Sequence, residues 1–135
     1  MKTQVEFRSN KFPAYDGEEE EINPGLWGKR LAEYIEQKLK AAGIETNGID
    51  GEDWGYIVWV KNEEFKIQVC CGHQNGDDDE FLCFIKPNQS VIRKLFKKID
   101  TTKQVGHVSA ALEKIFSSDP EIRDIKWEDE EAVKN

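Results

Sequence analysis

Two alternating segments in the middle of the chain constrain its fold most strongly. Residues 54–61 and 64–71 carry apolar side chains at every second position, and only Asn62 and Glu63 lie between them. Alternation of this kind is typical of half-buried strands, and a two-residue connection predicts a hairpin. Counting back from a Lys61–Glu64 pair gives a register that brings apolar residues together on one face. The predicted pairs are Val60 with Phe65, Val58 with Ile67, Tyr56 with Val69 and Trp54 with Cys71.

Three further segments are predicted as strands: residues 3–8, residues 44–49 more weakly, and residues 81–85. The last is apolar on both faces, which leaves two registers open. A tight hairpin at Asn75-Gly76 would turn Leu82 and Phe84 toward the core. A longer loop through the acidic residues 77–80 would instead turn Phe81, Cys83 and Ile85 inward. We favour the longer loop, because four consecutive acids pair badly within a strand ladder.

Helical periodicity predicts three helices. The first spans residues 24–42, capped by Asn23 with Pro24 at its first position, and stops at Gly43. The second spans residues 90–99 and starts at Ser90. The third follows a Thr101–Gln104 capping box and ends before Asp119-Pro120. Its predicted buried face is Val105, Val108, Leu112, Ile115 and Phe116, and Ile122, Ile125 and Trp127 are expected in a last strand or a packed arm.

This order of elements predicts an α+β, two-layer fold with a mainly antiparallel sheet of four to six strands and about three helices. Residues 1–127 are expected to form one domain, and residues 128–135 an acidic, disordered tail. The residues expected to be almost fully buried are Leu31, Ile35, Val58, Ile67, Val69 and Leu112.

The chain is acidic, with 27 acids against 19 bases and a formal net charge of -8. This charge argues against general nucleic-acid binding and against anionic membrane surfaces. The sequence starts without a secretory signal pattern, and no apolar run approaches the ~20 residues of a membrane helix. Three cysteines, two of them adjacent, make a poor disulfide framework. We therefore expect a cytoplasmic protein.

Candidate chemistry is sparse. Nucleophile motifs and glycine-rich phosphate loops are absent from the sequence. Cys71, His73 and Cys83 could hold zinc if an acid of residues 77–80 supplied the fourth ligand. They lack a paired Cys-x-x-Cys motif, so we expect packed core cysteines, no metal and no cofactor. The acidic run 18–21 is interpreted as lying near the positive end of the first helix, and residues 77–80 are interpreted as a solvated turn.

Two short segments, Asn23-Pro24-Gly25-Leu26-Trp27-Gly28 and Glu52-Asp53-Trp54-Gly55-Tyr56, resemble motifs of small, uncharacterised bacterial proteins. Those proteins carry an Asn-Pro-Gly-x-x-Gly helix start and a Glu-Asp-Trp-Gly-aromatic strand start. The resemblance implies no activity and assigns no functional residues.

The predicted sheet leaves apolar side chains on its outer face. The interface candidates there are Ile57, Trp59, Cys70, Leu82 and Phe84. Such a patch is covered either by the chain itself, for example by Trp127, or by a partner. The leading hypothesis is a small cytosolic acidic protein-binding module, adaptor-like or inhibitor-like and without catalysis, whose partner is a basic protein or a second copy. The alternative is a small-ligand binder or enzyme with a pocket between the first helix and the sheet, lined by Trp27, Trp54 and Tyr56.

Overall fold

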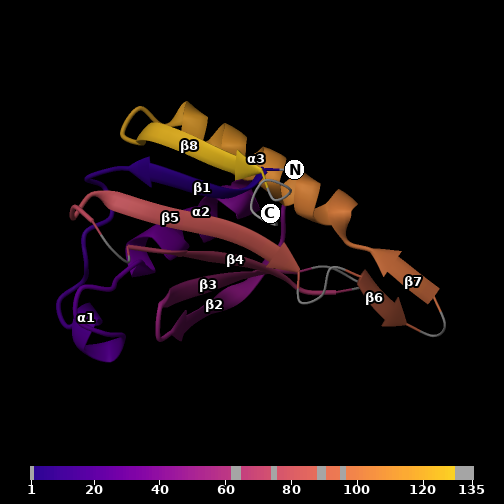
Figure 1. Ribbon diagram of the computed structural model, residues 1–135, viewed down its shortest axis with the longest axis horizontal. Coiled ribbons are helices and arrows are strands. Elements are labelled where there is room, and N and C mark those ends of the chain that lie inside the picture. Colours follow the sequence, from indigo (N-terminus) through magenta and orange to yellow (C-terminus); the bar gives the residue numbers. More distant parts are fainter. Residues whose placement is uncertain (1, 62–64, 74–75, 88–90, 95–96, 130–135) are drawn as a thin grey trace.

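The computed structural model describes residues 2–61, 65–73, 76–87, 91–94 and 97–129, and it has an α+β fold (Figure 1). Six strands form one open antiparallel sheet in the order β2-β3-β4-β5-β1-β8. The predicted fold class is therefore confirmed. The strands are β1 (Lys2–Arg8), β2 (Thr46–Glu52), β3 (Gly55–Val60), β4 (Ile67–Gly72), β5 (Glu80–Pro87) and β8 (Arg123–Asp129).

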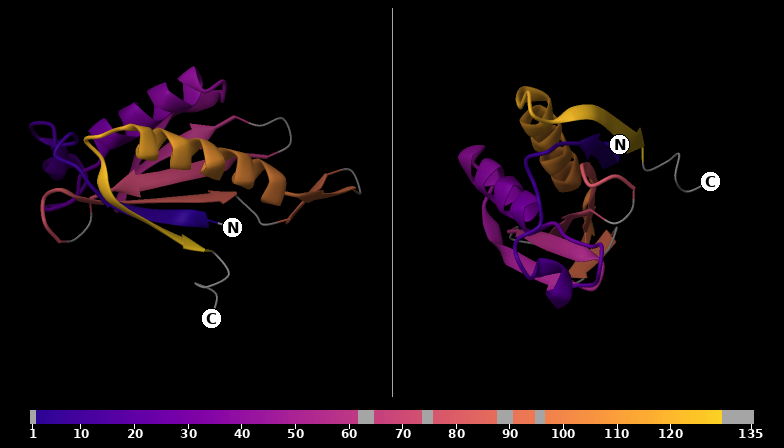
Figure 2. Two further views of the ribbon diagram at one scale, coloured as in Figure 1. Left: turned by 90° about the horizontal axis from the view of Figure 1, so that it is seen from above. Right: turned by 90° about the vertical axis from the view of Figure 1, so that its left-hand side faces the viewer.

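Two long helices cover one face of this sheet (Figure 2). Helix α2 (Lys29–Ala41) packs over β2, β3 and β4, and α3 (Thr102–Ser118) packs over β1 and β5. The four-residue helix α1 (Glu18–Glu21) lies near one end of the sheet. Apolar side chains fill the space between the two layers. The six predicted core residues are each no more than 1% exposed: Leu31, Ile35, Val58, Ile67, Val69 and Leu112.

The β3–β4 hairpin has the predicted faces but not the predicted register. Val60 pairs with Ile67, and Val58 with Val69, so the ladder is displaced by two residues. The chain leaves the ladder after Val60 and re-enters it at Ile67, while Phe65 is buried outside both strands. A displacement of two keeps every side chain on its own face, so apolar alternation cannot distinguish the two registers. The predicted turn residues, 62 and 63, lie outside the described residues.

Strand β5 adopts the favoured register. Phe81, Cys83 and Ile85 are buried in the core, and Leu82 and Phe84 lie half-buried on the outer face. The longer connection from β4 is confirmed, since β4 pairs with β5 from Ile67–Pro87 to Gly72–Leu82.

The helix predicted at residues 90–99 is wrong. A hairpin stands there, formed by β6 (Val91–Lys94) and β7 (Lys97–Asp100), and it projects beyond the end of the main sheet (Figure 1). The segment is short, and several of its apolar residues are β-branched, which favours strands. The predicted cap Ser90 and the predicted buried residues Leu95 and Phe96 lie outside the described residues.

Of the two arrangements expected for Ile122, Ile125 and Trp127, a last strand or a packed arm, the structure has a strand that starts at Arg123. Strand β8 pairs with β1, and Val5 stands opposite Trp127 on the helix-covered side. Glu128 and Asp129 complete this strand, and the remainder of the expected acidic tail, residues 130–135, lies outside the described residues.

Helix α2 starts later than predicted, at Lys29 rather than Pro24. The backbone of Trp27 is held in an extended bridge to His73, so the helix cannot include it. Asn23 does not cap the helix, because its side-chain amide donates to the carbonyl of Asp53 at 2.8 Å. The sequence favoured a local cap, and the fold uses a remote one.

That remote cap is Glu18, which is only 3% exposed. Its Oε2 accepts hydrogen bonds from the backbone N–H groups of Gly28 at 2.7 Å and Lys29 at 3.0 Å, and its Oε1 accepts one from Tyr15 at 2.9 Å. A carboxylate at this position satisfies N–H groups that the helix leaves free and interacts favourably with the helix dipole. The predicted place of this acidic run near the positive end of the first helix is confirmed for Glu18, whose carboxylate binds the backbone at the start of α2.

Replacing Glu18 with glutamine is expected to lower the free energy of unfolding by about 1–3 kcal/mol. Glutamine keeps the shape but points an amide N–H at a backbone N–H and removes the charge. Urea unfolding measures the change. The matched control is Glu20→Gln on the same short helix, where the side chain is exposed and the stability should stay within about 0.5 kcal/mol of the wild type. Equal effects of the two variants would contradict the capping role.

Three glycines bring backbones into direct contact near this cap. A Cβ on Gly28 would lie 2.7 Å from the Cα of Gly72, and a Cβ on Gly55 would lie 2.7 Å from the carbonyl oxygen of Cys71. The two motifs noted in the sequence therefore meet in space, through these glycines and through the bond from Asn23 to Asp53. Gly28 and Gly55 thus have a structural explanation, because a side chain on Gly28 would push the start of α2 away from β4, and one on Gly55 would push β3 away from β4.

Asp119, just after α3, connects three parts of the fold. It accepts hydrogen bonds from Lys11 Nζ at 2.7 Å, from the Tyr34 hydroxyl at 2.7 Å and from the backbone of Glu121 at 2.9 Å. Burial raises the pKa of Asp119, but these hydrogen bonds outweigh it and bring the pKa down to about 2. The charged form is therefore the one that the fold stabilises.

The Asp119→Asn variant is expected to be less stable than the wild type by about 1–2 kcal/mol at pH 7. The folded pKa lies below the unfolded value of 3.8, so this stabilisation is present above pH 4 and disappears as the pH falls toward 2. Unfolding curves of both proteins between pH 7 and pH 2 should converge at the acid end. A gap that stayed constant with pH would contradict this assignment, and Asp78→Asn, at an exposed site, is the control.

Candidate functional site

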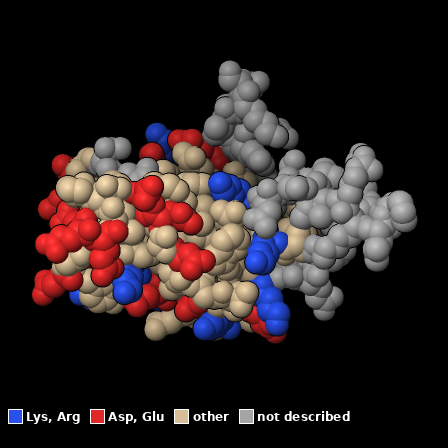
Figure 3. All heavy atoms as spheres, turned by 90° about the horizontal axis from the view of Figure 1, so that it is seen from below, with Lys and Arg blue, Asp and Glu red and all other residues tan. Residues whose placement is uncertain are grey.

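Exposed acids from three separate segments gather at one end of the molecule. The segments are α1 with the residues before it, the β2–β3 turn and the β4–β5 loop, which Figure 1 shows at the same end of the sheet. Figure 3 shows the red side chains concentrated there. Within these three segments, the acids that are exposed and form no ion pair with other described residues are Asp16, Glu19, Glu20, Glu21, Glu52, Asp53 and Asp78. We call this set the acidic end.

Neighbouring acids are neutralised, in contrast. Arg8 contacts Asp77 at 3.1 Å and Asp79 at 2.8 Å, and it also pairs with Glu80. Arg123 reaches Asp79 as well. The carboxylates raise the pKa of Arg8 through the hydrogen bond that Arg8 donates to Asp77 and through their charges, against the effect of burial. The structure thus has two groups of acids at this end. One group forms ion pairs with Arg8 and Arg123, and the other faces solvent without an ion pair.

Trp27 and His73 form a stacked pair beside the acidic end. Their ring centroids are 3.9 Å apart with an interplanar angle of 23°, and their backbones pair with each other. His73 Nδ1 lies 2.8 Å from the carbonyl oxygen of Glu80. Because a carbonyl only accepts, Nδ1 carries the proton. The imidazole is therefore engaged by stacking and by this bond.

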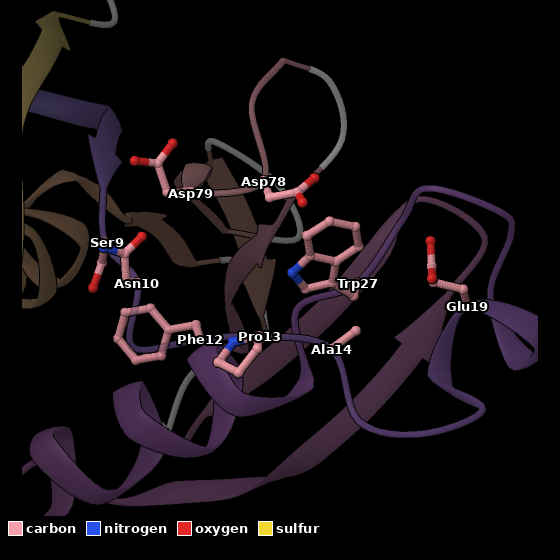
Figure 4. A pocket seen from close by; sticks show the side chains of 9 residues that line it. All are labelled: Ser9, Asn10, Phe12, Pro13, Ala14, Glu19, Trp27, Asp78 and Asp79. Atoms are coloured by element: carbon pink, nitrogen blue, oxygen red, sulfur yellow. The ribbon is translucent and has the colours of Figure 1, made fainter.

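A pocket of about 540 Å³ opens next to this pair (Figure 4). One wall is the segment after β1, which includes Ser9, Phe12 and Pro13. Trp27 lies opposite, and the carboxylates of Glu19, Asp78 and Asp79 also line the pocket. The indole Nε1 of Trp27 is buried and has no hydrogen-bond partner among the described residues.

The three predicted pocket aromatics do not share one pocket. Trp27 lines the pocket just described. Tyr56 lines a second hollow of about 560 Å³, together with Glu21, Glu52 and Asp53. Burial and the nearby charge of Glu18 raise the pKa of Tyr56 to about 12.

Trp54 lies on the other side of the sheet, because its ring contacts Phe84 with centroids 6.0 Å apart. Strand β4 runs between their strands, so Trp54 reaches over it. The three residues do not line a common site, because Trp54 lies in the turn before β3 and does not follow the alternation of that strand, which starts at Gly55 with a φ of 154°.

The outer-face candidates differ in accessibility. Ile57 is 5% exposed and Cys70 is fully buried, so the chain itself covers them and neither can anchor a partner. Trp59, Leu82 and Phe84 are half-buried.

Trp59 is partly covered by neighbours. Its Nε1 donates to Asp50 at 2.7 Å, and Lys66 Nζ lies 5.5 Å from its ring centroid. The suggested cover by Trp127 is wrong, because Trp127 stands on the opposite face with Val5.

The cysteines are buried thiols. Cys71 and Cys83 face each other across β4 and β5 within the core, and burial raises the pKa of both. Burial also raises the pKa of Cys70 to about 11. Thiols with raised pKa values are poor nucleophiles at neutral pH. Within the described ranges, no group of three His, Cys, Asp or Glu side chains is arranged to hold a metal.

Sequence reasoning missed the segment 9–14 and the acids that line the pocket with it. The acidic runs were visible but were interpreted separately, residues 18–21 as lying near the positive end of a helix and residues 77–80 as a solvated turn. The number of acids was a usable signal. Three loops rich in acids, in a chain this short, are expected to place several of those acids on one small surface.

None of the described helices is long and apolar enough to cross a bilayer. Comparison with protein-family models, with curated proteins and with solved structures finds no match to this chain.

Proposed function

We propose that this chain is a non-catalytic binding module that recognises a positively charged protein through its acidic end. The observation that carries the proposal is the set of seven exposed, unpaired acids contributed by three separate segments. Like charges held close together destabilise a fold unless a partner neutralises them. Complementary charge also accelerates the encounter with such a partner.

Two further features support this function. The hollows beside Trp27 and Tyr56 both open among these acids, so a partner meets shaped surface as well as charge. His73 and the three cysteines are engaged in packing, which leaves the described residues better suited to binding than to nucleophilic catalysis. The free thiols also favour the reducing cytoplasm as the place where the module works.

The test compares two variants with the same net charge. A peptide of six arginines, blocked at both ends, is titrated into the protein by calorimetry at low and moderate salt. We expect neutralisation of the acidic end to weaken binding by about tenfold or more, and neutralisation elsewhere to weaken it far less. The first variant carries Glu20→Gln, Glu21→Gln, Glu52→Gln and Asp53→Asn, and the second carries Glu45→Gln, Glu113→Gln, Glu121→Gln and Glu128→Gln.

Equal losses in the two variants would show that only net charge matters and would contradict the proposal. Absence of binding to the wild-type protein at low salt would also contradict it. Far-ultraviolet circular dichroism of both variants checks that each retains the fold.

A further inference from the structure

The indole N–H of Trp27 is one of two buried side-chain polar groups, with Oε1 of Gln104, that have no hydrogen-bond partner among the described residues. Trp27 is only 8% exposed, and its Nε1 has no partner among the described residues. Leaving such a donor unpaired costs the free energy of removing it from water. The ring is fixed by stacking on His73, so it cannot easily turn away to find another acceptor.

The donor faces the pocket at the acidic end. Figure 4 shows the nitrogen edge of the Trp27 ring turned toward the wall formed by Asn10, Phe12 and Pro13, with Asp78 above it. Nε1 itself has less than 1 Å² of water-accessible surface. A ligand must therefore displace a lining side chain to reach it. Asp78 is the side chain that can yield, because it is exposed and no ion pair within the described residues holds it.

The lining specifies the chemistry of an occupant. An indole N–H only donates, so the occupant must offer an acceptor. Glu19 and Asp78 stand at the same pocket without a cationic partner, and they repel an acceptor that is itself an anion. The acceptor is therefore neutral, such as a carbonyl, and a cation close to it is favoured. Phe12 and Pro13 supply an apolar wall for the aliphatic part of a long basic side chain.

We infer that this pocket takes an arginine or lysine of a peptide segment, with its side chain directed to Glu19 and Asp78 and a neighbouring backbone carbonyl accepting from Trp27 Nε1. The inference rests on the proposed function and names the point at which the positively charged partner is anchored. This pocket combines a buried hydrogen-bond donor with negative charge. The rest of the acidic end offers negative charge alone, which attracts any cation.

The experiment observes the indole N–H directly. The chain has four tryptophans, and a two-dimensional nitrogen–proton spectrum separates their indole signals. Trp27→Phe identifies the signal of Trp27, and Asp78→Asn supplies a second variant at an exposed position. The probes are acetyl-Gly-Arg-Gly-amide and the same peptide with citrulline, which has the shape of arginine without its charge.

We expect the arginine peptide to shift the Trp27 signal in a saturable way and to leave the Trp59 signal in place. The citrulline peptide should bind about tenfold more weakly, and Asp78→Asn should weaken the arginine peptide by about two- to fivefold. A Trp27 signal that shows contact with water and ignores both peptides would mean that a water satisfies the donor, and it would overturn the inference. Equal binding of the two peptides, or no effect of Asp78→Asn, would overturn it as well.

The two proposals fail in different ways. If six arginines bind at the acidic end while the Trp27 signal never moves, the anchor is wrong and the binding module stands. If no arginine peptide binds at all, the proposed function itself is wrong.

Discussion

Replacing Leu31 with alanine is expected to lower the free energy of unfolding by about 2–5 kcal/mol. Leu31 is fully buried in α2, where it belongs to the core between the helices and the sheet. The change removes apolar contacts and leaves a cavity that the surrounding strands can fill only in part. Urea unfolding, analysed with an unchanged dependence on denaturant concentration, measures the loss.

The matched control is Leu26→Ala. Leu26 precedes the same helix and is half-buried, so its truncation should cost about 1 kcal/mol or less. An unfolding curve of the Leu31 variant that coincides with that of the wild type would contradict the position assigned to this helix.

Replacing Gly55 with alanine is expected to cost about 3 kcal/mol or more. The new Cβ would lie 2.7 Å from the carbonyl oxygen of Cys71, which is rigid backbone in the centre of the sheet. Gly55 also has a φ of 154°, which disfavours a residue with a side chain. Either β3 moves away from β4 or the backbone turns, and both outcomes disrupt the ladder that begins at Tyr56 and Cys71.

Gly51→Ala is the control, four residues earlier on β2. A Cβ there would meet only flexible ends of the side chains of Ile22 and Tyr56, at 3.4 and 3.5 Å. Its effect should stay within about 1 kcal/mol. Equal melting temperatures for the two variants would show that the close contact at Gly55 does not determine the stability of the fold.

The layers and faces of the fold could be predicted because they depend on local periodicity. Alternation assigned Val58 and Val69 to the core face, and acids before Phe81 indicated a long loop into β5. The same alternation could not determine the register of β3 against β4, since a shift of two residues buries the same side chains. Near residues 91–99 the apolar pattern was too short to distinguish a helix from strands.

Of the candidate site, the sequence predicted only the negative charge and not the arrangement of the residues. Glu18 caps a helix whose first residue, Lys29, comes eleven residues later, and Trp27 stacks on His73, which follows the distant strand β4. No local propensity encodes such contacts. Trp27 was foreseen as a pocket residue. The residues predicted to line the pocket with it, Trp54 and Tyr56, instead lie on opposite faces of the sheet. The excess of acids, in contrast, was visible in the sequence.

The position of β1 has a consequence for how the chain acquires its structure. β1 lies inside the sheet, between β5 and β8, so Val5 pairs with Cys83 on one side and with Trp127 on the other. During synthesis, the β2–β3–β4 meander and α2 can associate early, whereas β1 finds its second neighbour only after residues 123–129 have left the ribosome. Such distant pairing slows folding and leaves strand edges open in the meantime. A permuted chain that joins β8 directly to β1 should therefore refold faster than the natural order.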